Sequence, residues 1–116
     1  MCSVVGIYKN KNAAKLAFYS LFSMQHGGQE AAGISSNENG KIHTIKDRGL
    51  VTEIFKEEHF ANVLKGDMAI GHTRYSTAGD DSILDAQPVY AKYGLGEFSI
   101  VHNGNLVNKD EVREEL

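Results

Sequence analysis

The sequence contains 116 residues, of which 12 are Lys or Arg and 15 are Asp or Glu, so its formal net charge is -3. A chain of this length forms one domain at most, and its scattered basic residues provide no footprint for nucleic acid or an anionic membrane. A single cysteine excludes an internal disulfide, the widely spaced histidines predict no zinc site, and the short apolar runs predict neither a signal peptide nor a membrane span. We therefore expect a soluble, cytoplasmic protein.

The chain is predicted to begin with a strand and a helix. Residues Cys2 to Tyr8 form a short run rich in β-branched side chains, which is typical of a buried strand. Asn12 can cap the following helix through its side-chain oxygen, and Gly27 and Gly28 can end it. Helical spacing predicts one core-facing stripe, made of Ala14, Ala17, Phe18, Leu21, Phe22 and Gln25.

A hairpin and short helices are predicted next. Two β-prone runs between Ala31 and Lys46 are joined by Asn39-Gly40, a dipeptide that accepts the positive φ angles of a two-residue turn. The segment from Leu50 to Leu64 mixes charged and apolar residues without a strand period. It is expected to form one or two short helices.

The last predicted elements are two strands and a helix. Met68 to Thr73 and Phe98 to Val101 are apolar and strand-like, and Lys109 to Leu116 begins an amphipathic helix. Strands in groups, separated by helices and including a hairpin, indicate an α+β layered domain rather than regular βαβ units.

The only cysteine allows two interpretations. A free cysteine is usually a small buried hydrophobe, and Cys2 fits that description. A cysteine nucleophile needs a base within reach, and a terminal α-amine has an ordinary pKa of about 7.7 to 8.0. Removal of Met1 would place such a base on Cys2 itself.

A second polar cluster, G-H-T-R-Y-S-T-A-G, spans Gly71 to Gly79 at the end of a predicted strand. Taken alone, Arg74 would be a solvated surface charge. Its position beside an apolar run and several polar neighbours favours a functional guanidinium. Such a group would bind a carboxylate through two parallel hydrogen bonds, which a lysine could not reproduce.

The third cluster, V-H-N-G-N-L-V-N, contains a second Asn-Gly pair at Asn103 and Gly104. Such a pair after a strand is most often a turn. The alternative is an oxyanion hole, in which an amide side chain and a backbone N–H stabilise the oxygen that gains charge during attack on an amide.

Together, four ordered blocks resemble the class II glutamine amidotransferases, N-terminal-nucleophile enzymes that release ammonia from glutamine. The resemblance extends from Cys2 to about Arg113. It implies an Ntn-hydrolase type of fold, a four-layer αββα sandwich, incomplete in this chain. The blocks are C-S-V-V-G-I, M-Q-H-G-G-Q-E-A-A-G-I, G-H-T-R-Y-S-T-A-G with the following A-Q-P, and H-N-G-N-L.

The resemblance implies a catalytic role for three residues. Cys2 is the nucleophile, and its freed amine is the general base. Asn103 and Gly104 form the oxyanion hole. No metal is implied among them.

It also implies three substrate-binding residues. Arg74, helped by Thr77, holds the α-carboxylate of glutamine. Tyr75 helps to close the site, which keeps ammonia in and water out.

Within the family, the details favour the branch that uses phosphoribosyl pyrophosphate over the sugar-phosphate aminating synthases, which show H-T-R-W, N-A-H-P and H-N-G-I. This chain has Tyr75, Gln87 before Pro88, and Asn105-Leu106 at those places. The implied function is ammonia supply for 5-phosphoribosylamine formation in purine biosynthesis, with glutamine and phosphoribosyl pyrophosphate as partners. A homo-oligomer is expected.

Two differences from the usual family pattern, together with the length of the chain, leave other functions open. Ser3 stands where the family usually has glycine, and Gly27 where it usually has arginine. Residues 1–116 are expected to be the N-terminal portion of a glutaminase domain, without the phosphoribosyltransferase domain that would bind Mg²⁺. An inactive fragment acting in binding or assembly, or part of a sugar-phosphate synthase, are the alternatives.

Overall fold

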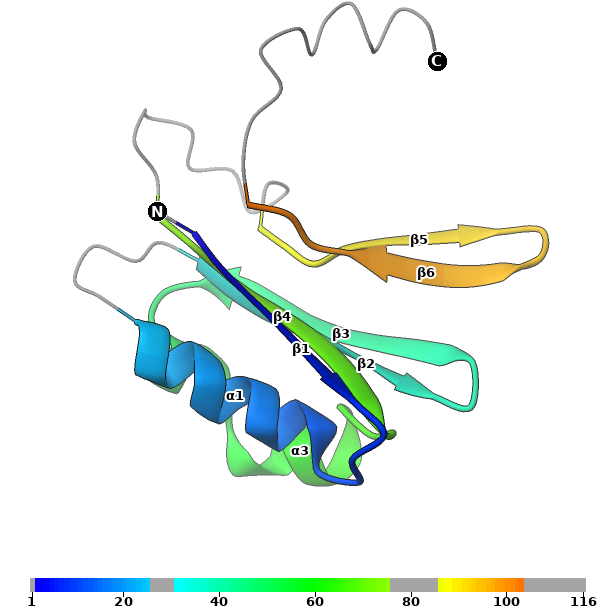
Figure 1. Ribbon diagram of the computed structural model, residues 1–116, viewed down its shortest axis with the longest axis horizontal. Coiled ribbons are helices and arrows are strands. Elements are labelled where there is room, and N and C mark those ends of the chain that lie inside the picture. Colours follow the sequence, from blue (N-terminus) through cyan, green and yellow to red (C-terminus); the bar gives the residue numbers. More distant parts are fainter. Residues whose placement is uncertain (1, 26–30, 76–85, 104–116) are drawn as a thin grey trace, which may run out of the picture.

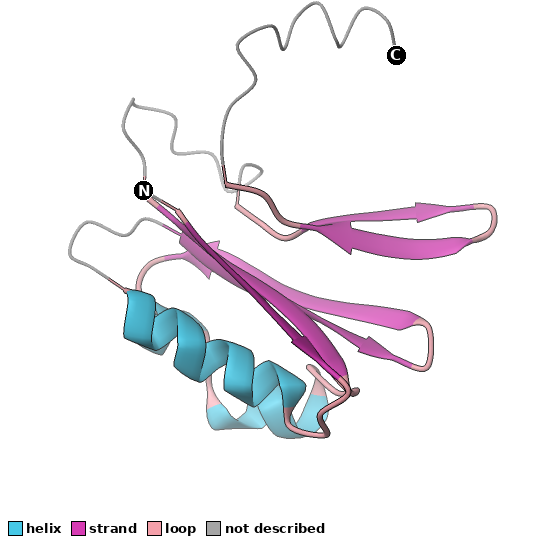
Figure 2. Cartoon of the chain, viewed as in Figure 1, coloured by secondary structure: helices cyan, strands magenta, loops and turns pink. Residues whose placement is uncertain are grey.

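The structure is a computed structural model that describes residues 2–25, 31–75 and 86–103 (Figure 1). Within these ranges no helix has the length and apolar character needed to cross a bilayer. Helices and strands alternate in groups along the chain (Figure 2). In chain order they are β1 (Ser3–Tyr8), α1 (Ala13–Met24), β2 (Ala31–Glu38), β3 (Lys41–Arg48), α2 (Val51–Ile54), α3 (Glu57–Asn62), β4 (Met68–Arg74), β5 (Val89–Tyr93) and β6 (Gly96–Ile100).

The strands form two antiparallel sheets. One has four strands in the order β1-β4-β2-β3, and the other is the β5-β6 hairpin. Figure 1 shows the helices on one face of the four-stranded sheet and the hairpin over its other face. The described residues therefore form helix, sheet and sheet layers, which confirms the predicted α+β class.

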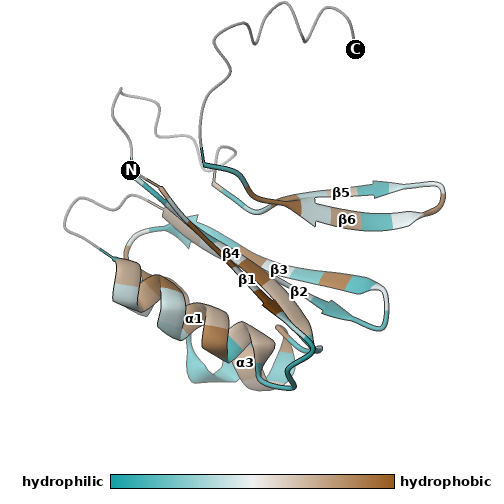
Figure 3. Ribbon diagram, viewed as in Figure 1, coloured by the Kyte–Doolittle hydropathy of each residue, from teal (hydrophilic) through white to brown (hydrophobic). Residues whose placement is uncertain are grey.

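The apolar core lies between the helices and the four-stranded sheet. Figure 3 shows hydrophobic stretches along β1, β4 and α1, which contribute to it. Leu21 of α1 is fully buried and packs against Gly71 of β4, where an added Cβ would lie 2.9 Å from the Leu21 Cδ1 atom. The absence of a side chain at Gly71 thus brings the helix close to the sheet.

The predicted stripe of α1 is partly wrong. Ala14, Ala17 and Leu21 are buried as expected, but Phe22 is 50% exposed. Phe22 follows Leu21 by one residue, which turns it about 100° around the helix axis and away from the sheet. Phe18 lies at the margin of the core.

The predicted side-chain cap of α1 is also wrong. Asn12 is the N-cap residue, but its side chain makes no capping hydrogen bond. Instead, Asn10 Oδ1 accepts a hydrogen bond of 2.8 Å from the Asn12 backbone N–H. The asparagine that closes this turn is therefore two residues earlier. The helix ends at Met24, and Gly27 and Gly28 lie outside the described residues.

The hairpin centred on Asn39-Gly40 is confirmed. Both residues have positive φ angles, 52° and 91°, and Glu38 pairs with Lys41 across the turn. The two short helices α2 and α3 occupy the segment where they were expected.

The two late strands are confirmed with different bounds. β4 extends one residue further, to Arg74, and β6 covers Gly96–Ile100. Its partner β5 was not predicted, because the sequence V-Y-A-K-Y at Val89–Tyr93 does not alternate apolar and polar residues. The predicted helix at Lys109 to Leu116 lies outside the described residues.

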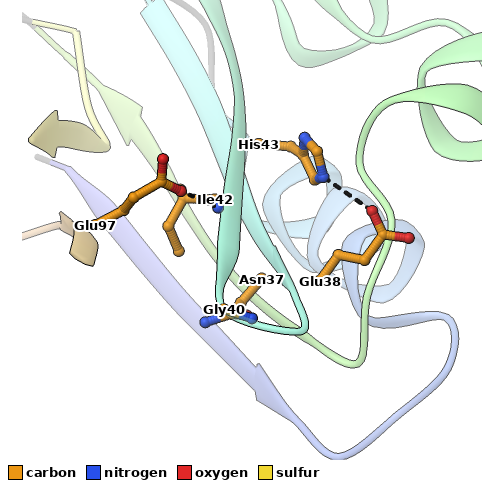
Figure 4. A network of polar contacts seen from close by, with 6 residues as sticks. All are labelled: Asn37, Glu38, Gly40, Ile42, His43 and Glu97. Carbon is orange, nitrogen blue, oxygen red and sulfur yellow. Dashed lines mark hydrogen bonds and ion pairs between the residues drawn. The ribbon is translucent and has the colours of Figure 1, made fainter. Parts of the chain in front are cut away.

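Glu97 links the β5-β6 hairpin to β3 through a hydrogen bond (Figure 4). Its Oε1 accepts a hydrogen bond of 2.7 Å from the Ile42 N–H on this edge strand, and its Oε2 accepts one of 2.8 Å from the Tyr90 hydroxyl. The Ile42 and Tyr90 bonds favour the carboxylate and lower the Glu97 pKa. Ser35 and Ser99, 2.8 Å apart between their hydroxyl oxygens, add a second link between the sheets.

The segment before β5 docks on β2 and β3. Pro88 is fully buried and lies over Gly33. Lys46 Nζ donates hydrogen bonds of 3.0 Å to the carbonyl oxygens of both Ala86 and Pro88. This arrangement holds the residue between them, Gln87, on the sheet face opposite the helices.

Replacing Gly33 with alanine is expected to loosen this docking. The new Cβ would overlap the Gln87 carbonyl oxygen and lie 2.7 Å from Lys46 Cβ and 2.8 Å from Pro88 Cδ. We expect Gly33→Ala to lower the free energy of unfolding by about 1–3 kcal/mol, measured by denaturant titration. Gly6→Ala is the matched control, because nothing lies within 4 Å of its added Cβ. Equal unfolding midpoints for the two variants would contradict the packing described.

Candidate functional site

Cys2 and Arg74 are brought together by the pairing of β1 with β4. Ser3 pairs with Thr73 and Val4 with His72, so the antiparallel register places Cys2, one residue earlier, beside Arg74. Side chains alternate between the faces of a strand. Val5 and Gly71 face α1, and because Cys2 and Arg74 are each an odd number of residues, three, from them, Cys2 and Arg74 belong to the opposite face.

Asn103 joins this end of the sheet from the segment after β6. Its Nδ2 donates a hydrogen bond of 2.9 Å to the backbone carbonyl oxygen of Cys2. The two residues are 101 positions apart in sequence. Cys2 is half-buried and Asn103 is exposed, so the site lies at the surface of the described residues.

The backbone of His102, the residue before Asn103, is held at both its N–H and its C=O. His102 N–H donates a 2.7 Å hydrogen bond to Gln87 Oε1. The His102 carbonyl oxygen accepts one of 3.0 Å from His72 Nε2, which must carry the proton because a carbonyl oxygen only accepts. Burial lowers the His72 pKa, against the opposing effect of its bond to His102, so the ring is neutral at pH 7.

The other predicted site residues are placed less completely. Tyr75 directly follows β4 and is half-buried. Thr77 and Gly104 lie outside the described residues. In the part of the chain that is described, no three His, Cys, Asp or Glu side chains are grouped as metal ligands.

Three residues of the site were not recognised as such from the sequence. His72 was noted as a neighbour of Arg74, Gln87 was noted as a difference between family branches, and Lys46 carried no signal. Their common feature is contact with the segments around Gln87 and His102. That contact depends on tertiary packing, which linear spacing does not reveal.

Comparison with known proteins finds amidophosphoribosyltransferases from several organisms. No protein-family model matches the chain. An amidophosphoribosyltransferase of Methanocaldococcus jannaschii is 47% identical over 100% of this chain and 25% of its own length. That of Archaeoglobus fulgidus is 50% identical with the same coverage. The chloroplastic amidophosphoribosyltransferase 2 of Arabidopsis thaliana is 46% identical over 99% of the chain and 20% of its length.

Two solved structures are similar to this chain over 99% of its length. The allosteric regulatory enzyme of purine biosynthesis superposes with a TM-score of 0.89 at 37% identity, over 99% of this chain and 24% of that one. Glutamine phosphoribosylpyrophosphate amidotransferase from B. subtilis, complexed with ADP and GMP, gives 0.85 at 36% identity with the same coverage. The chain thus spans about a quarter of the length of these relatives. Over its whole length, this chain is similar in sequence and in fold to about a quarter of the length of these amidophosphoribosyltransferases.

Proposed function

We propose that this chain is the N-terminal part of a glutaminase domain that supplies ammonia to phosphoribosyl pyrophosphate in the first step of purine biosynthesis. The observation that carries the proposal is the 2.9 Å hydrogen bond from Asn103 Nδ2 to the Cys2 carbonyl. It joins the oxyanion donor to the nucleophile residue, at the same end of the sheet as Arg74. The whole-chain likeness to amidophosphoribosyltransferases supports the same reaction.

Cys2 is the nucleophile in this proposal. After removal of Met1, the α-amine of Cys2 takes the thiol proton, and the sulfur attacks the side-chain amide carbon of glutamine. The C–N bond breaks as the ammonium group returns the proton to the leaving nitrogen. Ammonia and a γ-glutamyl thioester result, and water then hydrolyses the thioester to glutamate.

The other site residues stabilise the oxygen that gains charge and hold the substrate. The amide nitrogen of Asn103 carries two hydrogens, of which one is bonded to the Cys2 carbonyl. The second, together with the Gly104 N–H, is assigned to the oxygen that gains charge. Arg74, with Thr77, binds the α-carboxylate, and Tyr75 closes the site against water.

The proposal includes parts beyond these residues. The helix, sheet and sheet layers would be completed by a fourth, helical layer to an αββα sandwich of the Ntn-hydrolase type. A phosphoribosyltransferase part of the enzyme would bind the acceptor and Mg²⁺. The enzyme would act in the cytoplasm as a homo-oligomer.

The proposed function is tested by covalent labelling of the full-length protein. A glutamine analogue with a chloroketone in place of the amide should add one adduct, on Cys2, in a protein that has lost Met1 by intact mass. Excess glutamine should protect against the label. A mass that retains Met1, with no labelling, would reject the enzyme and favour the inert binding or assembly piece.

A further inference from the structure

We propose that His72 and Gln87 are positioning residues that hold the backbone of His102 and thereby aim the side-chain amide of Asn103 at the reacting oxygen. We call the two side chains together with the His102 backbone the His102 clamp. The inference rests on the proposed function, because it assigns the clamp a role in that reaction.

The His72 side of the clamp is rigid. His72 lies on β4, which is paired on both sides, by β1 and by β2. Its side chain is 0% exposed, and its Nε2 lies 3.0 Å from the His102 carbonyl oxygen. Its Nδ1 is buried without a hydrogen-bond partner among the described residues. Burial lowers the His72 pKa, so the ring stays neutral and keeps one proton, on the nitrogen that faces His102.

The Gln87 side is fixed through its backbone. Lys46 Nζ donates to the carbonyl oxygens on either side of Gln87, those of Ala86 and Pro88, at 3.0 Å each. Pro88 is buried over Gly33. The side-chain oxygen of Gln87 then accepts the His102 N–H at 2.7 Å.

The two sides together fix the backbone of His102. Its N–H, in the peptide group before its Cα, and its C=O, in the peptide group after its Cα, are each bonded to an anchored side chain, so neither peptide group rotates freely. Asn103 follows immediately and reaches back to the Cys2 carbonyl. Because a shift of about 1 Å in a catalytic group can cost about 100-fold in rate, fixing the His102 backbone matters for the Asn103 amide that follows it.

The test uses paired variants of the full-length protein. His72→Leu and Gln87→Leu each remove one hydrogen bond, whereas His72→Gln keeps a donor and Gln87→Glu keeps an acceptor. We expect the leucine variants to lower kcat with glutamine about 10- to 100-fold, with KM for glutamine within about threefold. The conservative variants should recover most of the loss. Activity with supplied ammonia should stay unchanged, because the part that binds the acceptor is not altered, and unfolding midpoints equal to that of the wild type should show that each variant is folded.

A double-mutant cycle separates positioning from general damage. In an Asn103→Ala background the donor that the clamp aims is already gone, so adding Gln87→Leu should lower kcat by less than about threefold more. If the two substitutions together lowered kcat by the product of their separate effects, the proposed role of the clamp would be rejected. The buried His72→Leu variant could misfold, but Gln87 is only half-buried, and its variant provides the same test.

Failure of the clamp and failure of the proposed function give different results. A wild-type protein that uses glutamine, with leucine variants equally active, would reject the clamp alone. A wild-type protein that uses ammonia but not glutamine would reject both.

Discussion

Replacing Cys2 with alanine is expected to lower glutamine-dependent product formation about 10⁴-fold or more while leaving ammonia-dependent formation intact. Without the sulfur no thioester forms, and loss of a nucleophile costs far more than loss of one binding contact. The variant should keep its fold and its bond to Asn103, because the acceptor of that bond is the backbone carbonyl of Cys2. Product formation is measured with each nitrogen source in parallel.

Ser3→Ala is the matched control for this variant. Ser3 is the next residue, is also half-buried, and by strand alternation belongs to the opposite face of β1. It should retain glutamine use within a few-fold. Glutamine-dependent activity that survives in Cys2→Ala would remove the nucleophile from the mechanism, whatever the control shows.

The parts of the fold that were predicted from the sequence are those with local causes. The Asn39-Gly40 turn needs only two residues that accept positive φ, and the register of β2 with β3 follows from it. By contrast, β5 was missed because its stability comes from pairing with β6 and from the Glu97 link to β3. Neither contact leaves a periodic pattern in Val89–Tyr93.

The site residues also divide into those with a local signal in the sequence and those that only tertiary contacts reveal. Cys2 was singled out because it directly follows Met1, whereas Arg74 and Asn103 were singled out because each stands in a polar cluster after an apolar run. Their proximity is set by the register of β1 with β4 and by one long-range hydrogen bond. The contacts of His72 and Gln87 required the structure, because the His102 backbone that both contact is 30 and 15 residues away.

Replacing Asn103 with alanine is expected to lower kcat with glutamine about 10²- to 10³-fold, equivalent to about 2.7–4 kcal/mol of transition-state stabilisation. The donor acts on charge that appears only after the sulfur attacks, so KM for glutamine should change little. Steady-state kinetics with glutamine give both values. Ammonia-dependent activity should again be retained.

Two further variants make the Asn103 result specific. Asn103→Asp keeps the size but replaces the N–H donors with a carboxylate that would repel the developing oxyanion, so it should be at least as impaired as the alanine variant. Asn12→Ala changes an exposed asparagine whose side chain makes no capping bond, and it should behave as wild type. An Asn103→Ala enzyme with unchanged kcat and a raised KM would show that this amide holds the substrate rather than the oxyanion. The contact with Cys2 would then be a feature of ground-state binding.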